Sequence, residues 1–233
     1  MGTALLMEYY AQLPQPKEGE DPRKSAAKFQ VAVEKFRKKV AGRYTQGTLQ
    51  RLLDCNHDQT RQAAVFALGM LGSMDSNALL AARLRDNDPH VRHLAADALW
   101  SLWFAADTDT NNQELQRLMR FRDSRQATLG LDALIKRTPG FAEAYNQRAV
   151  FHFRQKDYQR SITDCERVLK LNPYHFGALS GLAQCHIKMN KPRAALKVFR
   201  QAYRINPSLD GVQETIRALE SALGEEGKKD DKK

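Results

Sequence analysis

Few residues of this chain have the types and spacing that chemistry requires. His90 and His93 are three positions apart, which would place both imidazoles on one helix face as metal ligands. Because no third ligand lies nearby in the sequence, we interpret them as surface histidines and predict no metal site. Asp107–Asn112 resembles part of a calcium loop but has neither a glycine nor a closing glutamate. We interpret that stretch as a connecting loop.

A thiol and an imidazole could also form a nucleophile and its general base, and Cys165 and His186 are the candidates. Both lie in segments of helical periodicity, where a cysteine packs as a small hydrophobe. The three cysteines are scattered and odd in number, which favours a reducing cytoplasm over disulfides. Phosphate-binding glycine loops and serine-nucleophile elbows do not occur in the sequence. We therefore predict a cytoplasmic protein that is not an enzyme and uses no cofactor.

The elements that would position any binding residues repeat along the chain. Within 141–207, Pro173 and Pro207 are 34 residues apart, and in this register Ala149 aligns with Ala183. Each unit has two segments of helical periodicity, with small residues where the helix axes would approach and a proline after the second segment. The pattern resembles tetratricopeptide repeats, which are helix–turn–helix units of this length.

A shorter repeat precedes this one, because residues 56–71 realign with residues 87–102. These units resemble the short HEAT-like repeats of phycobilisome lyases. The resemblance implies that an aspartate at each turn caps the following helix and that an arginine one turn later ties neighbouring units together. The residues in these roles would be Asp58 with Arg61 and Asp88 with Arg92. HEAT-like hydroxylases use His-Glu dipeptides, which this sequence lacks, so a lyase or hydroxylase is the less favoured alternative.

Together the repeats predict an all-α protein, a right-handed alpha-solenoid of antiparallel helix pairs in which HEAT-like units are followed by tetratricopeptide units. The predicted order begins with an N-terminal tail or linker (1–23), a basic capping helix (24–43) and two short HEAT-like repeats (44–107). About three tetratricopeptide-type units follow (108–207), of which the first is degenerate. The chain then ends with a C-terminal capping helix (208–223) and a disordered charged tail (224–233). Trp100, Trp103 and Phe104 are expected to pack where the two repeat classes meet.

The helix predicted over 24–43 is amphipathic and strongly basic. Its narrow apolar seam consists of Ala26, Phe29, Val33, Phe36 and Val40. We expect the seam to pack on the next helix. A partner helix, an anionic membrane surface or nucleic acid are the alternatives that the sequence leaves open. No apolar run is long enough to predict a transmembrane segment.

By resemblance, the first helix of each tetratricopeptide unit lines a concave groove. The groove positions are Asn146, Gln147, Val150, Phe153, Arg154, Ser180, Gly181, Gln184, Ile187 and Lys188. The amides can pair with a peptide backbone, Phe153 and Ile187 can hold apolar side chains, and the cations can hold an acidic one. The clamp that grips chaperone tails is not present, because its places are taken by Asn146, Val150 and Gly181. We predict a non-catalytic scaffold or adaptor that binds an extended peptide or protein partner.

The net charge of +10 is concentrated in the tetratricopeptide pair, and it suggests an acidic partner. The second helices present a basic outer face of Arg160, Arg167, Lys170, Lys197, Arg200 and Arg204. We interpret this as a solvated face; electrostatic binding to nucleic acid or another anionic surface is the alternative function. Nucleic acid is not favoured, since few aromatic residues are interleaved with the cations to stack on bases. The identity of the partner and the oligomeric state stay open.

Overall fold

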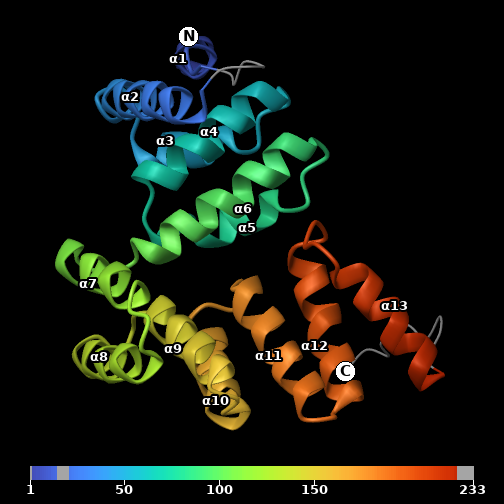
Figure 1. The fold of residues 1–233 in the computed structure, drawn as a ribbon. Helices are drawn as coiled ribbons and strands as arrows, with labels where there is room; N and C mark the ends of the chain where they lie inside the picture. The colour runs from blue at the N-terminus through green and yellow to red at the C-terminus, as the bar shows by residue number, and fades with distance from the viewer. Residues whose placement is uncertain (1, 15–20, 225–233) are drawn as a thin grey trace. The chain divides into compact units, whose positions relative to one another are not determined.

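The structure is a computed structural model that describes residues 2–14 and 21–224. Within these residues the chain forms thirteen α-helices and one short 3-10 turn, with no strand (Figure 1). This confirms the predicted all-α solenoid class. The chain divides into two compact units, the first ending at Leu102 and the second beginning at Trp103. No helix of the described part is long and apolar enough to cross a membrane.

The first unit contains two N-terminal helices and two helix pairs. The N-terminal helices are α1 (Gly2–Ala11) and α2 (Pro22–Ala41), and the pairs are α3 (Gln46–Leu52) with α4 (Asp58–Leu71) and α5 (Asn77–Arg83) with α6 (Pro89–Phe104). A 3-10 turn (Met74–Ser76) leads into α5, and the last residues of α6 belong to the second unit. The pairs correspond to the two repeats predicted over 44–107.

The prediction of an N-terminal tail over residues 1–23 is wrong for the part that the structure describes. Residues 2–11 form α1, in which Leu6 is fully buried and Tyr10 packs edge-on against Phe66 of α4 at 5.6 Å between ring centroids. Residues 15–20 of the predicted linker lie outside the described residues. The helix predicted over 24–43 begins at Pro22, where Asp21 caps it by accepting a hydrogen bond from the amide of Arg23 at 2.9 Å.

A buried ion pair joins the two helix pairs of the first unit. The Arg61 guanidinium donates to both carboxylate oxygens of Asp86, at 2.9 and 2.8 Å, and also to the carbonyl of Cys55 at 2.9 Å. Burial opposes ionisation of Asp86, but the hydrogen bonds from Arg61 outweigh it and hold its pKa below the usual range. The role predicted for Arg61, tying neighbouring units together, is therefore confirmed. Arg92 instead donates to carbonyls of its own preceding turn, at Asp86 and Asn87.

The two predicted capping aspartates differ in the structure. Asp88 accepts a hydrogen bond from the backbone amide of Val91 at 2.8 Å and therefore caps α6 as predicted. Asp58 is the first residue of α4 and accepts only from the next amide, that of Gln59, at 2.8 Å. The cap position of α4 is occupied by His57, whose side chain makes no capping hydrogen bond. The prediction that Asp58 is the cap is thus wrong by one position.

The second unit is a row of helix pairs that pack in chain order (Figure 1). The pairs are α7 (Asp109–Met119) with α8 (Ser124–Arg137), α9 (Ala142–Arg154) with α10 (Tyr158–Leu171) and α11 (Phe176–Lys188) with α12 (Pro192–Ile205), followed by the single helix α13 (Val212–Leu223). The loop predicted over Asp107–Asn112 is wrong for its last four residues, because α7 begins at Asp109 after a cap by Thr108. The tail predicted over 224–233 lies outside the described residues, except for Gly224.

Small residues occupy the close crossings, as the repeat pattern predicts. Ala149, Ala183 and Ala195 are almost completely buried between helices. Ser161 is also buried, and its hydroxyl donates to the carbonyl of Ala149 at 2.9 Å, which joins α10 directly to the backbone of α9. A larger side chain at these positions would separate the helix axes, so the pattern of small residues sets the spacing of each pair.

The turn within each of the last two helix pairs has the same backbone conformation. Lys156 and Asn190 occupy equivalent positions and both have positive φ values, 63° and 55°. This left-handed residue lets the next amide reach back to the helix end, as when the amide of Asp157 donates to the carbonyl of His152 at 2.9 Å. Asp157 then caps α10 by accepting from the amide of Arg160. The turn is therefore built from local backbone geometry.

Candidate functional site

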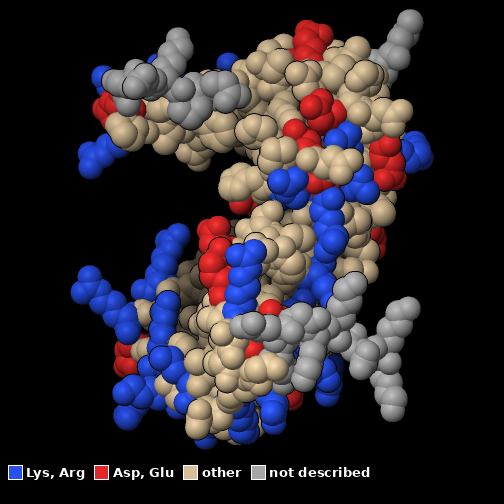
Figure 2. All heavy atoms as spheres, turned by 90° about the vertical axis from the view of Figure 1, so that its right-hand side faces the viewer, with Lys and Arg blue, Asp and Glu red and all other residues tan. Residues whose placement is uncertain are grey.

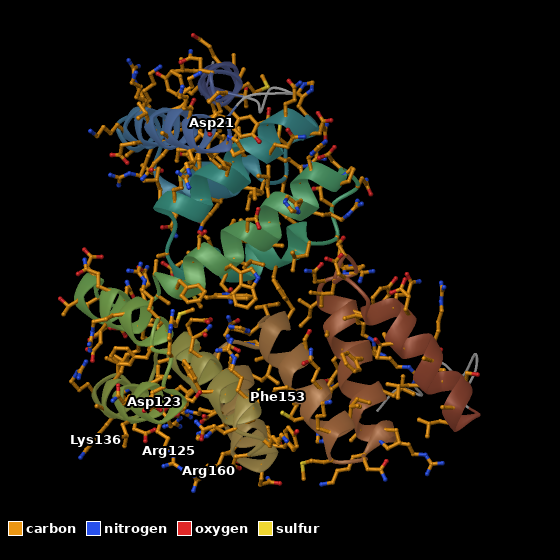
Figure 3. The ribbon with its side chains drawn as sticks, in the orientation of Figure 1. Asp21, Asp123, Arg125, Lys136, Phe153 and Arg160 are labelled. Atoms are coloured by element: carbon orange, nitrogen blue, oxygen red, sulfur yellow. The ribbon has the colours of Figure 1, made fainter. Side chains whose placement is uncertain are left out.

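A cavity of about 410 Å³ opens in the second unit between α9, α11 and the start of α13. Its wall includes five of the predicted groove residues, namely Phe153, Ser180, Gln184, Ile187 and Lys188. Phe153 lies on the side of α9 that faces α11 (Figure 3). Ile187 is 40% exposed, and Gln184 and Lys188 are exposed as well. The structure therefore brings these five residues together around one cavity, which we call the α11 groove.

The opposite wall of the α11 groove comes from residues that the repeat pattern did not identify. Leu209 and Val212 contribute apolar surface, and Asp210 and Thr215 contribute oxygen atoms. These residues follow the last repeat, in the connection to α13 and its first turn, so no internal alignment could relate them to the groove positions. The result is an apolar floor whose rim carries both a cation, Lys188, and an anion, Asp210.

Two of the predicted groove amides are engaged inside the protein. Asn146 is 5% exposed and donates to Oε1 of Glu143 at 2.9 Å, and Gln147 donates to the same oxygen at 2.6 Å. Glu143 is fully buried, so these amides satisfy a carboxylate that has no access to water. Asn146 and Gln147 lie outside the lining of the α11 groove.

The second oxygen of Glu143 is held by a histidine. Nε2 of His175 lies 2.9 Å from Oε2 of Glu143, while Nδ1 accepts a hydrogen bond from the amide of Ala178 at 3.0 Å. Because Nδ1 is an acceptor, the proton belongs on Nε2, which donates to the carboxylate. The indole of Trp103 stacks on this imidazole at 4.1 Å between ring centroids. Trp103 is therefore a buried packing residue, and the cluster positions the first turns of α9 and α11.

The remaining predicted groove residues on α9 face elsewhere. Val150 is 36% exposed, and the Arg154 guanidinium lies over the ring of Phe151 at 5.6 Å. Neither lines the α11 groove. Gly181 has space around it, since a Cβ placed there would meet only Sγ of Cys165 at 3.5 Å. The described groove is therefore formed mainly by α11, the start of α13 and the connection before it, with Phe153 from α9 and Phe199 from α12.

An arginine in the first helix of the α9–α10 pair is neutralised by two carboxylates. The Arg148 side chain makes two hydrogen bonds to Asp164, at 2.8 and 2.6 Å, and one to Asp132 at 2.7 Å. These contacts, together with the desolvation that opposes them, leave the pKa of Arg148 raised. Arg148 thus joins α8, α9 and α10 through charged hydrogen bonds.

Several cations of the basic outer face already have partners. Arg160 pairs with Asp157 at 3.4 Å and Arg200 pairs with Glu220 at 2.7 Å. Arg167 donates to the carbonyl of Pro139 and lies over the ring of Tyr145 at 5.7 Å. Figure 2 shows Lys and Arg side chains on the surface of the second unit with acidic residues among them. The cations are therefore partly compensated within the chain, which weakens the field that they present to a polyanion.

The residues considered for catalysis are placed as follows. Burial raises the pKa of the Cys165 thiol to about 12, and burial also raises that of Cys185. A thiol with this pKa is protonated at neutral pH and is a poor nucleophile. Burial lowers the pKa of His186. His90 and His93 are both exposed, and His93 lies 3.6 Å from Asp97. These placements agree with packing and surface roles for the five side chains.

Two family models match consecutive parts of the chain. The model for HEAT repeats matches residues 45–130, and the model for the tetratricopeptide repeat matches residues 140–208. The first match thus reaches into α8, whereas we predicted a degenerate tetratricopeptide unit over that pair. The fold and these matches define a helical repeat protein of mixed HEAT and tetratricopeptide type.

Comparisons with known proteins found similar chains, and the relative from Rhizobium etli is the one that shows the family. A TPR repeat-containing protein of Rhizobium etli is 30% identical over 142 residues, which is 60% of this chain and 70% of that protein. Anaphase-promoting complex subunit 3 of Schizosaccharomyces pombe is 28% identical over 87 residues, which is 37% of this chain but 13% of that protein. The chain is also similar to a solved structure, the first TPR of Spaghetti (RPAP3) bound to HSP90 peptide SRMEEVD. The match covers 50% of this chain and 89% of that chain, with 18% sequence identity and a TM-score of 0.43. The chain belongs to the tetratricopeptide repeat proteins.

Proposed function

We propose that the chain is a non-catalytic adaptor that binds an extended peptide segment of a partner protein in the α11 groove. The observation that carries this proposal is the cavity of about 410 Å³ at which five predicted groove residues meet. A concave surface with an apolar floor and a few polar groups at its rim is the usual form of a binding site. Tetratricopeptide arrays provide such surfaces because each helix pair contacts only its neighbours and leaves one face uncovered.

The lining of the groove suggests how a peptide would be held. Phe153, Ile187 and Leu209 would surround one apolar side chain of the peptide. The Gln184 amide can both donate to and accept from the peptide backbone. Lys188 and Asp210 stand at the rim and would contact polar residues on either side of the apolar anchor. The preference for an acidic residue would come from Lys188, with Asp210 opposing it at a nearby position.

A quantitative affinity capture with the full chain tests this function. Ile187→Asp introduces a charge into the apolar floor, and Ile187 is 40% exposed, so the substitution leaves the buried core intact. We expect it to lower the yield of specifically captured partners by about tenfold or more, as for a central interface anchor. Phe153→Ala together with Gln184→Ala should act in the same direction.

Leu129→Asp is the matched control, because Leu129 is 69% exposed on α8 and does not line the groove. It also adds a negative charge, so it separates a local effect from a change in net charge. Circular dichroism should give the same helical content for all variants. If the groove variants capture the same partners in the same yield as the unmodified chain and the control, the groove is not the binding surface.

A further inference from the structure

The turns inside the last two helix pairs place cations at one edge of the second unit. The α9–α10 turn and the α11–α12 turn have the same backbone conformation, and both lie at the lower edge of that unit in Figure 1. Because α9 packs against α11, the two turns are neighbours. Exposed cations stand on both turns, and we call this set the basic edge: Arg154, Lys156, Lys188 and Lys191.

The basic edge keeps its positive charge in the folded chain. Its three lysines are exposed, and the Arg154 guanidinium lies over the ring of Phe151, a contact that leaves the charge in place. Asp157 is the one acidic residue in the sequence of the two turns, residues 154–160 and 188–193. Its carboxylate accepts from the amide of Arg160 at 3.1 Å and pairs with the Arg160 guanidinium at 3.4 Å. Asp157 and Arg160 therefore compensate each other.

The charge of Lys191 also acts inside the protein. Burial lowers the pKa of His186, and the positive charge of Lys191 lowers that pKa further. Glu166 on α10 opposes this shift, but its effect is smaller than that of Lys191. The electrostatic field at the end of α11 is therefore positive even where a carboxylate also acts on it.

The basic edge continues from the α11 groove. Lys188, the last residue of α11, belongs to both, and Phe153 of the groove directly precedes Arg154. Asp210, on the other wall of the groove, follows the end of α12, whereas Lys191 precedes its start. These positions are the opposite ends of a helix of 14 residues, which is about 20 Å long. The charge along the groove therefore changes sign from one end to the other.

We propose that the segment bound in the α11 groove carries acidic residues on one side of its apolar anchor and that these residues bind the basic edge. This inference rests on the proposed function of the groove. Packed helices have axes about 8–10 Å apart, a distance that about three residues of an extended peptide span. Aspartates or glutamates shortly after the anchor would therefore meet Lys188 first, and then Lys191 and Lys156. On the other side of the anchor, Asp210 favours a neutral or basic residue.

The connection with the groove favours an acidic peptide over a nucleic acid. A nucleic acid could bind the cations, but its sugar–phosphate backbone has no apolar side chain for the floor around Ile187. Along the groove its phosphates would also approach the carboxylate of Asp210. A peptide can place an acidic residue at one end, an apolar residue in the middle and a basic residue at the other end. That order is the complement of the groove and the basic edge.

Selection of peptides by the full chain tests the inference. The probe is a displayed library of random peptides of about twelve residues, which span about 40 Å when extended. We expect the selected peptides to share an apolar residue and to have aspartate or glutamate enriched on one side of it only. Lys156→Glu with Lys191→Glu should weaken the binding of a selected peptide by about tenfold or more in fluorescence anisotropy, because two attractive contacts become repulsive.

The same peptide with its acidic residues changed to lysine provides the reciprocal measurement. It should bind the unmodified chain weakly and regain affinity for the double variant, as expected for charges in direct contact. The matched control is Lys136→Glu with Lys170→Glu, which changes the net charge equally at exposed positions in the last turns of α8 and α10. It should leave the affinity within about twofold, since distant exposed charges are screened.

A shortened chain tests whether the end of the sequence contributes. Residues 225–233 lie outside the described part and include four acidic and four basic residues. We expect a chain ended at Gly224 to select peptides with the same one-sided acidic pattern. Loss of the pattern would mean that residues 225–233 recognise the acidic residues, and it would overturn the inference.

The outcomes separate this inference from the function on which it rests. If Ile187→Asp abolishes binding of the selected peptides but they show no one-sided acidic pattern, the groove binds peptides and the inference is wrong. Equal losses in the basic edge variant and the matched control would also overturn it, as would oligodeoxythymidine that binds the chain more tightly than the selected peptides. If no peptide is selected, or if Ile187→Asp has no effect, the proposed function of the groove fails as well.

Discussion

At the scale of single residues, buried charge is the feature that distinguishes this array. Arg148 lies between helices, and its side chain is 19% exposed while that of Asp164 is 5% exposed. The pair is satisfied on both sides, because Arg148 has a second carboxylate in Asp132. A buried ion pair of this kind adds little net stability over apolar packing, but the loss of one partner leaves an uncompensated charge.

The Arg148–Asp164 pair gives an asymmetric prediction. Arg148→Leu should lower the free energy of unfolding by about 3 kcal/mol or more, because it leaves the buried Asp164 carboxylate without its two charged hydrogen bonds. The double variant Arg148→Leu with Asp164→Leu should recover much of this loss, since no charge is then left buried. Urea denaturation measures both. A double variant as unstable as the two single changes added together would show that the pair is not coupled in this way.

At the scale of elements, the repeat pattern predicts helices well because it is local. The spacing of apolar and small residues within one unit determines where each of α9 to α12 begins and ends, and the turns follow from the same alignment. Helix α1 has no counterpart in either repeat and is short. Its burial depends on Tyr10 meeting Phe66 in a distant part of the sequence. The periodicity of the sequence does not predict that contact.

The residues of the α11 groove, too, could be predicted from the repeat pattern only in part. Phe153, Ser180, Gln184, Ile187 and Lys188 could be identified because equivalent positions of the repeat face the same way. Asn146 shares the pattern but is buried, since Glu143 one turn earlier accepts its amide hydrogen. The alignment of the repeats predicts which way a side chain points, but it does not predict which residue that side chain contacts. The wall formed around Leu209 follows the last repeat, where the alignment no longer applies.

The left-handed residue in the α9–α10 turn provides a prediction at this scale. Lys156 has φ of 63°, a conformation that costs a residue with a Cβ about 1–2 kcal/mol and costs glycine little. Lys156→Gly should therefore raise the free energy of unfolding by about 0.5–1 kcal/mol, after the greater chain entropy of glycine is subtracted. Thermal denaturation would measure the change.

Glu166→Gly is the control for this change, because Glu166 is exposed in the middle of α10. There glycine should instead lower stability by about 1 kcal/mol. A loss of stability for Lys156→Gly as large as that of the control would mean that the turn does not hold this conformation in solution.

At the scale of the whole molecule, the row of helix pairs in the second unit is closed by a single helix. Val212 and Ile216 of α13 belong to the same buried cluster as Phe199 of α12. Arg200 on α12 pairs with Glu220 on α13 at 2.7 Å. Helix α13 therefore covers an apolar surface that the last helix pair would otherwise expose, and it also supplies a wall of the α11 groove.

Removal of α13 by ending the chain after Asn206 should destabilise the second unit by about 3 kcal/mol or more, because the apolar surface around Phe199 becomes exposed. Thermal denaturation and binding of a hydrophobic dye would report this. Arg200→Ala removes the ion pair with Glu220 but leaves the apolar cover by α13 in place, so it should cost less, about 1 kcal/mol. A truncated chain as stable as the full chain would contradict the role of α13 as a cap.

The stacking of Trp103 on His175 supplies a built-in optical reporter. An indole enclosed in protein emits at shorter wavelength than one in water. Opening of the cluster around Glu143 would therefore shift the emission of Trp103 to longer wavelength. The other tryptophan, Trp100, is only half-buried and contributes a background that Trp100→Phe would remove. Loosening of the second unit could thus be followed without attaching any dye.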